Sequence, residues 1–251
     1  MKNERQTTRD REIIYGVNPV MEALKVGRRR FYSVTVKPAH KKGGPASEIV
    51  TLAESRRIPV DYQPVEEIAK RERIEGHQGV LANVSPPVYV NLDDIADPSS
   101  SPQNYMLAAL DGVMDPRNLG AIIRSAEVFG VSGVIFPYDR ACAYTPVAAK
   151  ASAGAGERMK LCRVVNMAET IRKLSDDGFT CVALEEDAEQ NFDLAPDGPL
   201  ALVFGGEGTG VRELVKRRCG NTAKIPMKGG VGSLNVSTAA AIAFYIASKR
   251  G

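Results

Sequence analysis

Apolar segments of strand length alternate with helical patterns through residues 105–251. MLAAL (106–110) is apolar throughout, which is typical of a strand buried on both faces of a parallel sheet. Further strands are expected at 131–137, 181–184 and 201–206, each separated from the next by room for a helix. Strands that alternate with helices form a parallel sheet covered on both faces. The sequence therefore predicts an α/β fold for this part of the chain.

The remaining elements of this region follow from local signals. Asn166 and Glu169 form a capping-box pattern, which indicates the start of a helix that Gly178 ends. The short apolar run Ile225-Pro226-Met227 is expected to be the last strand, and an alanine-rich helix follows it. Three more helices are expected, at 118–129, 146–153 and 210–219.

Residues 12–85 are expected to form a smaller α/β module. Its length is small but within the range of independent domains. The stretch SPPVYVNLDDIADPSSSPQN holds four prolines and four serines, which predicts a linker over 86–104 before the larger domain at 105–251. Residues 1–11 are charged and lack an apolar core, and are predicted to be a disordered basic tail. Within the module, strands are expected at 31–38, near Val60 and at 79–84, and helices at 45–57 and 65–72.

Charge is distributed unevenly along the chain. Residues 1–84 hold 16 Lys and Arg against 11 Asp and Glu, a balance of +5, whereas residues 85–251 hold 17 against 19, a balance of −2. This asymmetry indicates either that the N-terminal module meets a polyanion or that it has a solvated basic surface.

Several classes of protein are disfavoured by the same sequence. The four cysteines are far apart, without C-x-x-C spacing, so no metal framework is expected and the thiols should be reduced. Both histidines lie in the N-terminal third, so the later region lacks the imidazole of Ser-His and Cys-His pairs. No signal peptide is recognisable, and no apolar run has the ~18 residues of a membrane helix. A cytoplasmic protein without membrane or metal partners is expected.

The glycine-rich turn after the strand at 201–206 is the most distinctive of three polar motifs. It reads Gly205-Gly206-Glu207-Gly208-Thr209-Gly210. Val211 stands where a dinucleotide fingerprint needs its third glycine, so a nicotinamide-dependent dehydrogenase is disfavoured. A carboxylate such as Glu207 repels phosphate and suits a ligand with hydroxyl or amino donors.

The two other motifs also follow expected strands. DGVMDPRNLGAIIRSAEVFG (111–130) follows the first apolar strand; its Asn118 is either a helix N-cap or a site residue, and its Arg124 forms either a surface ion pair or part of a site. The third motif carries Gly229, Gly230 and Gly232, and then Ser233-Leu234-Asn235 at the start of the last helix. Open α/β sheets bind ligands at the carboxyl ends of their strands, so one shared site is expected there.

Taken in order, these motifs resemble a known family. N118-L-G-x-I-x-R124, then F-G-G-E207-G-x-G, then I225-P-M…S233-L-N235-V-S are similar to the three signature motifs of the SpoU family of RNA ribose methyltransferases. The resemblance covers essentially all of 105–251. The N-terminal module, which ends in H77-Q-G-V, resembles the RNA substrate-binding domain that precedes the catalytic domain in many members.

The resemblance implies a trefoil-knotted α/β methyltransferase domain that binds S-adenosylmethionine, works as a homodimer and methylates a ribose 2′-hydroxyl of RNA. It implies a catalytic group made of Arg124, Asn118, Glu207, Ser233 and Asn235, and a cofactor-binding group made of Gly205, Gly206, Ile225, Met227 and Leu234. The family residue that matches Arg124 activates the hydroxyl. Because a guanidinium is always protonated, it could instead hold a phosphate or stabilise the alkoxide.

In the N-terminal domain the resemblance implies RNA contacts. The basic residues expected to meet phosphates are Arg28, Arg29, Arg30, Lys41, Lys42, Arg56 and Arg57. Phe31, Tyr32 or Tyr62 could stack on bases, although Phe31 and Tyr32 are also expected to be partly in the core.

The RNA target has several alternatives. The separate N-terminal domain favours ribosomal RNA, with a guanosine of the large-subunit RNA as the expected nucleotide. Transfer RNA, an adenosine methylated for antibiotic resistance, and a non-catalytic role in ribosome assembly are the alternatives.

Overall fold

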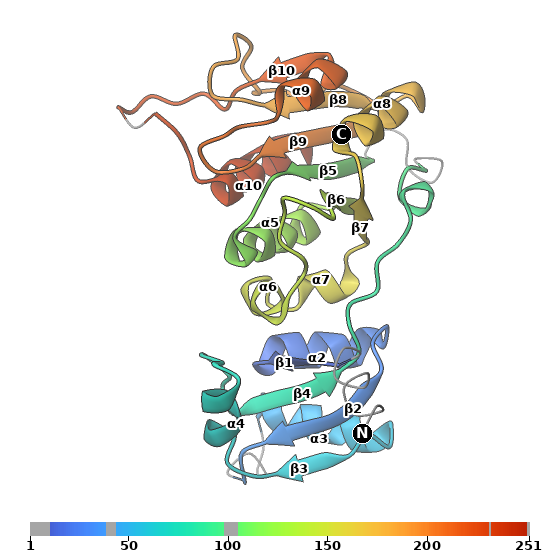
Figure 1. Cartoon of the computed structure of the whole chain (residues 1–251), viewed down its shortest axis with the longest axis vertical. Helices are drawn as coiled ribbons and strands as arrows, with labels where there is room; N and C mark the ends of the chain where they lie inside the picture. The colour runs from blue at the N-terminus through green and yellow to red at the C-terminus, as the bar shows by residue number, and fades with distance from the viewer. Residues whose placement is uncertain (1–10, 39–43, 98–104, 231, 250–251) are drawn as a thin grey trace.

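Two α/β units, one above the other in Figure 1, make up the chain. The computed structural model describes residues 11–38, 44–97, 105–230 and 232–249. The smaller unit is N-terminal and the larger one follows an extended connection. No helix in the described part of the chain is long and apolar enough to cross a membrane.

The smaller unit is built on a four-stranded sheet in the order β1-β4-β2-β3. Its core is apolar, with Ile14, Leu24 and Ile49 fully buried. Alternate residues of a strand face opposite sides, so Ile14 contacts the core on one face while Tyr15 packs on the other face with Val65 and Leu81. The elements are β1 (Glu12–Tyr15), α2 (Val17–Val26), β2 (Phe31–Val36), α3 (Pro45–Ser55), β3 (Val60–Tyr62), α4 (Glu66–Arg71) and β4 (Val80–Val84).

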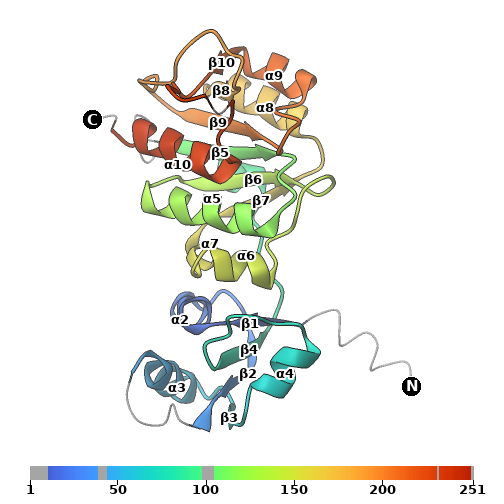
Figure 2. The ribbon, with the colours of Figure 1, turned by 90° about the vertical axis from the view of Figure 1, so that its left-hand side faces the viewer.

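The larger unit is a six-stranded parallel sheet in the order β10-β8-β9-β5-β6-β7. One apolar core joins α5, α6, α7 and α10 to one face, and a second joins α8 and α9 to the other; Figure 2 shows α5 and α10 together on one side. The elements are β5 (Met106–Asp111), α5 (Pro116–Val128), β6 (Gly133–Pro137), α6 (Pro146–Ala151), α7 (Ala155–Arg158), β7 (Leu161–Val164), α8 (Met167–Asp176), β8 (Thr180–Leu184), β9 (Leu200–Gly205), α9 (Glu213–Cys219), β10 (Asn221–Ala223) and α10 (Val236–Ala247). The predicted parallel α/β fold is confirmed.

Two predicted details of this unit are wrong, and two of its elements were not predicted. The last strand is β10, not the run from Ile225 to Met227, which continues beyond the sheet. Asp115 caps α5, because its side chain accepts a hydrogen bond from Arg117 N at 2.7 Å; Asn118 is therefore inside the helix. The strand β7 and the short helix α7 were not predicted, since they are short and carry charged residues.

The segment predicted as a linker packs on the larger unit in its described part. Val90 forms a parallel bridge with Cys162, and Ile95 is fully buried in the core beneath α8. A short 3₁₀ helix (Leu92–Asp94) lies between them. The connection is therefore attached to the sheet before β5 begins.

A buried ion cluster joins the two units. Arg29 is only 4% exposed; its Nε donates to Glu157 of α7 at 2.8 Å, and its Nη1 donates to Glu12 of β1. Its guanidinium also lies 5.7 Å from the ring centre of Tyr144. The prediction that Arg29 contacts RNA is therefore wrong, because the side chain is enclosed between the units.

Burial and charge oppose each other in this cluster. Burial raises the pKa of Glu157 and of Glu12 above their ordinary values, and the nearby guanidinium only partly offsets this. Burial alone would lower the pKa of Arg29, but the two carboxylates outweigh it and keep that pKa raised. Arg29 therefore stays charged and carries the pairing.

Replacing the cation tests this junction. Arg29→Met leaves both carboxylates without a partner, so we expect a loss of ~3–5 kcal/mol of stability at neutral pH. Because the pKa values of both carboxyls are raised, each takes up a proton more readily in the folded state; the penalty should shrink as pH falls and grow as pH rises through those values. Calorimetric unfolding of the full chain across this range measures it. The control is Arg172→Met, which breaks exposed helix pairs with Glu169 and Asp176; equal unfolding of both variants at every pH would contradict the account.

Candidate active site

The site lies at the switch point of the sheet, where successive strands begin to be added on the other side of β5. β5 stands between β6 and β9, and its last residue, Asp111, is paired with Gly205 at the end of β9. A crevice forms at such a switch point because the connections leave the two strands in opposite directions. The first two polar motifs therefore begin side by side although they are far apart in sequence.

A cleft of about 550 Å³ opens beside these strand ends, a size typical of small-molecule sites. One wall is the turn Gly205–Gly210, another is Glu185–Asp187 after β8, and the third is the segment that leads into α10. All five residues predicted to bind the cofactor line it, together with three of the predicted catalytic residues: Gly205, Gly206, Ile225, Met227, Leu234, Glu207, Ser233 and Asn235.

Close backbone contacts explain the first two glycines of the turn. A Cβ on Gly205 would lie 1.9 Å from the carbonyl carbon of Gly210, and one on Gly206 would lie 2.4 Å from the carbonyl oxygen of Gly112. Gly210 has a φ of +62°, which favours glycine. The glycines of the turn thus present backbone to the cleft, beside the side chain of Glu207.

A chain of side-chain hydrogen bonds joins the three motifs. Asn118 donates its amide to Glu207, and its Oδ1 accepts from Asn235 Nδ2 at 3.2 Å. Asn235 Oδ1 in turn accepts from Ser237 N at 2.8 Å and from Ser237 Oγ at 2.6 Å, which caps α10. Asn118 therefore uses both ends of its amide to hold the turn after β9 against the start of α10.

Two acidic residues that the sequence analysis did not single out hold the far end of the turn. Asp111 is buried and accepts from Arg212 N at 3.0 Å and from Arg212 Nε at 2.9 Å, and these bonds raise the pKa of Arg212. Glu185 accepts from Val211 N at 2.7 Å. A carboxylate that ends an otherwise apolar strand, as Asp111 does, was the available signal.

Arg124 is not brought to this cleft. It is exposed on α5 and has no hydrogen bond or ion pair within the described residues. It stands six positions after Asn118, which turns it roughly 240° around the helix. The structure therefore gathers Asn118, Glu207, Ser233 and Asn235 in one place and leaves Arg124 on another face.

The predicted RNA-contacting residues have different surroundings. Arg28 is exposed, yet its Nη1 donates to the carbonyl oxygens of Arg158 and Met159 at 3.0 and 3.2 Å. Arg30 is exposed, with its guanidinium 5.2 Å from the ring centre of Tyr32. Lys41 and Lys42 lie outside the described residues.

The described residues offer neither a cluster of metal ligands nor a reactive thiol near the cleft. Among the described residues, no three His, Cys, Asp or Glu side chains come together to hold a metal ion. Burial raises the pKa of the Cys142 thiol to about 11, so it is a poor nucleophile at neutral pH. The site offers a carboxylate, amides, a hydroxyl and backbone groups.

Comparison with known proteins agrees with this arrangement. A model of the SpoU rRNA methylase family matches residues 105–245, and a model of RNA 2′-O ribose methyltransferase substrate-binding domains matches residues 13–90. The 23S rRNA (guanosine-2′-O-)-methyltransferase RlmB of Vibrio cholerae is 36% identical over 243 residues, which are 95% of this chain and 97% of that protein.

Two solved structures are similar over nearly the whole chain. An S-adenosylmethionine-bound rRNA methyltransferase from Sinorhizobium meliloti has a TM-score of 0.78 and 26% identity, with 98% of this chain and 90% of that one covered. The SpoU methyltransferase AviRb from Streptomyces viridochromogenes, also with S-adenosylmethionine, has a TM-score of 0.80 and 24% identity over 98% and 92%. The second likeness supports the fold alone.

Proposed function

This chain belongs to the SpoU rRNA methylase family, and from that premise we propose that it methylates a ribose 2′-hydroxyl of ribosomal RNA with S-adenosylmethionine. A guanosine of the large-subunit RNA is the expected target, supported by the activity named for the Vibrio cholerae relative. The observation that carries the proposal is the convergence of Asn118, Glu207 and Asn235 on one cleft.

The cleft fits S-adenosylmethionine in both charge and shape. Its side chains include the carboxylates of Glu186, Asp187 and Glu207, which suit a ligand with a sulfonium, an ammonium and ribose hydroxyls and would repel a phosphate-bearing cofactor. Ile225 and Leu234 supply apolar surface beside the glycine turn. When bound, the cofactor supplies an electrophilic methyl group.

The protein's part in the reaction is to orient the hydroxyl and to stabilise its oxygen as the proton leaves. Glu207, Ser233 and Asn235 form the polar wall that faces this hydroxyl, and Asn118 holds two of them in position. Arg124 contributes a cation that holds the adjoining phosphate or stabilises the developing alkoxide. With the cofactor bound, the oxygen would gain the methyl group, the hydroxyl proton would pass to water, and the sulfur would leave as the neutral thioether of S-adenosylhomocysteine.

We also propose a homodimer, in which Arg124 of one copy completes the cleft of the other. Val128, one turn after Arg124 on the same face, is 65% exposed, and Tyr245 of α10 is 48% exposed. The rings of Phe129 and Tyr245 lie 5.8 Å apart, so exposed apolar side chains of α5 and α10 lie near one another. Light scattering should give the molar mass of two chains at concentrations where the enzyme is active; a single-chain mass there would contradict the dimer.

The family resemblance extends the proposal to chain topology and location. We expect the segment from β10 to α10 to be threaded as a trefoil knot, supported by its passage from the sheet edge at β10 to the face that holds α5. A cytoplasmic location follows from a ribosomal RNA substrate, and the N-terminal domain (12–85) would bind that RNA.

Mapping of ribose methylation tests the function. Large-subunit and transfer RNA from cells with and without this protein should differ at one ribose of the large-subunit RNA, and the unmodified chain should restore the methyl group. Arg124→Lys keeps the positive charge but removes the planar donor fork. It should bind S-adenosylmethionine normally in calorimetry and fail to restore methylation.

The outcomes separate two claims. A methyl group that changes only in transfer RNA, or in no RNA, would overturn the proposed substrate. Full restoration by Arg124→Lys would leave the substrate standing and would remove the requirement for the guanidinium.

A further inference from the structure

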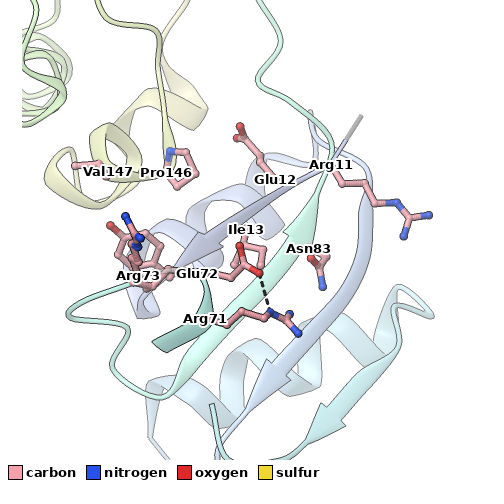
Figure 3. Close-up of a pocket in the computed structure, with 11 residues that line it drawn as sticks. Arg11, Glu12, Ile13, Arg71, Glu72, Arg73, Asn83, Pro146 and Val147 are labelled. Atoms are coloured by element: carbon pink, nitrogen blue, oxygen red, sulfur yellow. Dashed lines mark hydrogen bonds and ion pairs between the residues drawn. The ribbon is translucent and has the colours of Figure 1, made fainter. Parts of the chain in front are cut away.

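The sheet of the N-terminal unit has a second face that is only partly covered. Helix α4 packs on one part of it, over Tyr15 and Leu81. Beyond α4 lies a groove of about 730 Å³ between this face and the start of α6 in the other unit. Its lining includes Arg11, which precedes β1, and Ile13 and Tyr15 of β1. Residues 71–74 line it from the end of α4 and the following turn, Asn83 from β4, and Pro146 and Val147 from α6 (Figure 3).

The charges in this groove favour an anion. Three guanidiniums line it, from Arg11, Arg71 and Arg73, against two carboxylates. Both carboxylates are already engaged: Glu12 pairs with the buried Arg29, and Glu72 accepts from Arg71 Nε at 3.0 Å. Positive charge therefore remains available along the groove.

Arg73 is the least constrained of these cations. It is exposed and has no ion pair within the described residues, and its φ of +53° puts it in the left-handed region, which disfavours non-glycine residues. Figure 3 shows Arg73 beside Pro146 and Val147, with Arg71, Asn83 and Arg11 toward the other end. Guanidiniums thus line the groove from the unit junction to the edge of the sheet.

The groove also offers groups that contact bases. Arg11 and Asn83 line the groove. The guanidinium of Arg11 lies 4.1 Å from the ring centre of Tyr32, which stands beside the groove, and Asn83 Nδ2 donates to Ser33 Oγ at 3.1 Å. Aromatic and guanidinium planes stack on unpaired bases, and amides bond to base edges. A sheet face with these groups beside cations suits single-stranded nucleic acid better than an isolated anion.

Helix α6 connects the groove with the active-site unit. Its first residues, Pro146 and Val147, line the groove, and α6 packs against both β1 and α5. A strand in the groove would therefore extend toward α5, the helix that carries Asn118.

We propose that this junction groove binds single-stranded RNA next to the target nucleotide, with Arg73 and Arg71 on phosphates and with Asn83 and Tyr32 on bases. The proposal rests on the proposed function for the identity of the nucleic acid. It places the RNA contacts in the groove rather than on the arginine run at 28–30.

Arg73→Gln tests the groove against a matched control. Arg57 also follows a helix, is exposed, has a left-handed φ of +58° and has no ion pair within the described residues, but it does not line the groove. Binding of a short fluorescein-labelled single-stranded RNA is measured over a range of salt concentrations. Loss of one phosphate contact should lower the salt slope by about 0.7 and the affinity about fivefold at 0.1 M salt, whereas Arg57→Gln should change neither.

Methylation of an unmodified large-subunit RNA transcript separates the two proposals. Arg73→Gln should raise KM for the RNA and leave kcat unchanged, because the groove holds RNA away from the reacting atoms. If Arg73→Gln and Arg57→Gln behave alike while methylation proceeds, the groove is overturned and the function stands. If the short RNA binds through Arg73 while no RNA is methylated, the function is overturned and the groove stands.

Discussion

The parallel pairing of β5 with β9 is the constraint on which the rest of the structure depends. It brings Asp111 beside Gly205, and the chain then leaves in two directions, into α5 and into the glycine turn. Asn118 closes the space between them, because its amide reaches both Glu207 and Asn235. One side chain therefore links three distant segments beside the cleft, and the two apolar cores fix where those segments begin.

Much of this arrangement could be predicted from local sequence. Apolar strands such as 106–110 indicated a buried parallel sheet, and the order of the motifs placed their ends at one edge. Short elements were not predicted correctly, because a few residues give similar signals for a strand and for a turn. Ile225 and Met227 were predicted as a strand from their apolar side chains, but they line the cleft instead. Asn118 was considered as the N-cap of α5 because the sequence alone does not distinguish it from Asp115, another polar residue near the start of the helix. The hydrogen bond from Arg117 N to Asp115 identifies the cap.

The burial and the partners of charged side chains were harder to predict than the positions of apolar strands. Arg29 stands in a basic run that reads as surface, yet its partner Glu157 is supplied by the other unit. No local pattern contains that contact, which forms only when the two units pack together. The same packing creates the junction groove, so the basic residues that face it were recognisable only in three dimensions. Arg124 remains a prediction of the family resemblance, since its surroundings in one chain do not include the cleft.

Cofactor affinity measured by calorimetry shows whether Asn118 assembles the S-adenosylmethionine cleft. Asn118→Ala removes two side-chain hydrogen bonds, so the affinity should fall about tenfold. Asn166→Ala is the matched control, because it removes an N-cap bond from α8 at a cost of about 1 kcal/mol in stability and should leave the affinity unchanged. A folded Asn118→Ala variant that binds the cofactor as tightly as the unmodified chain would contradict the account.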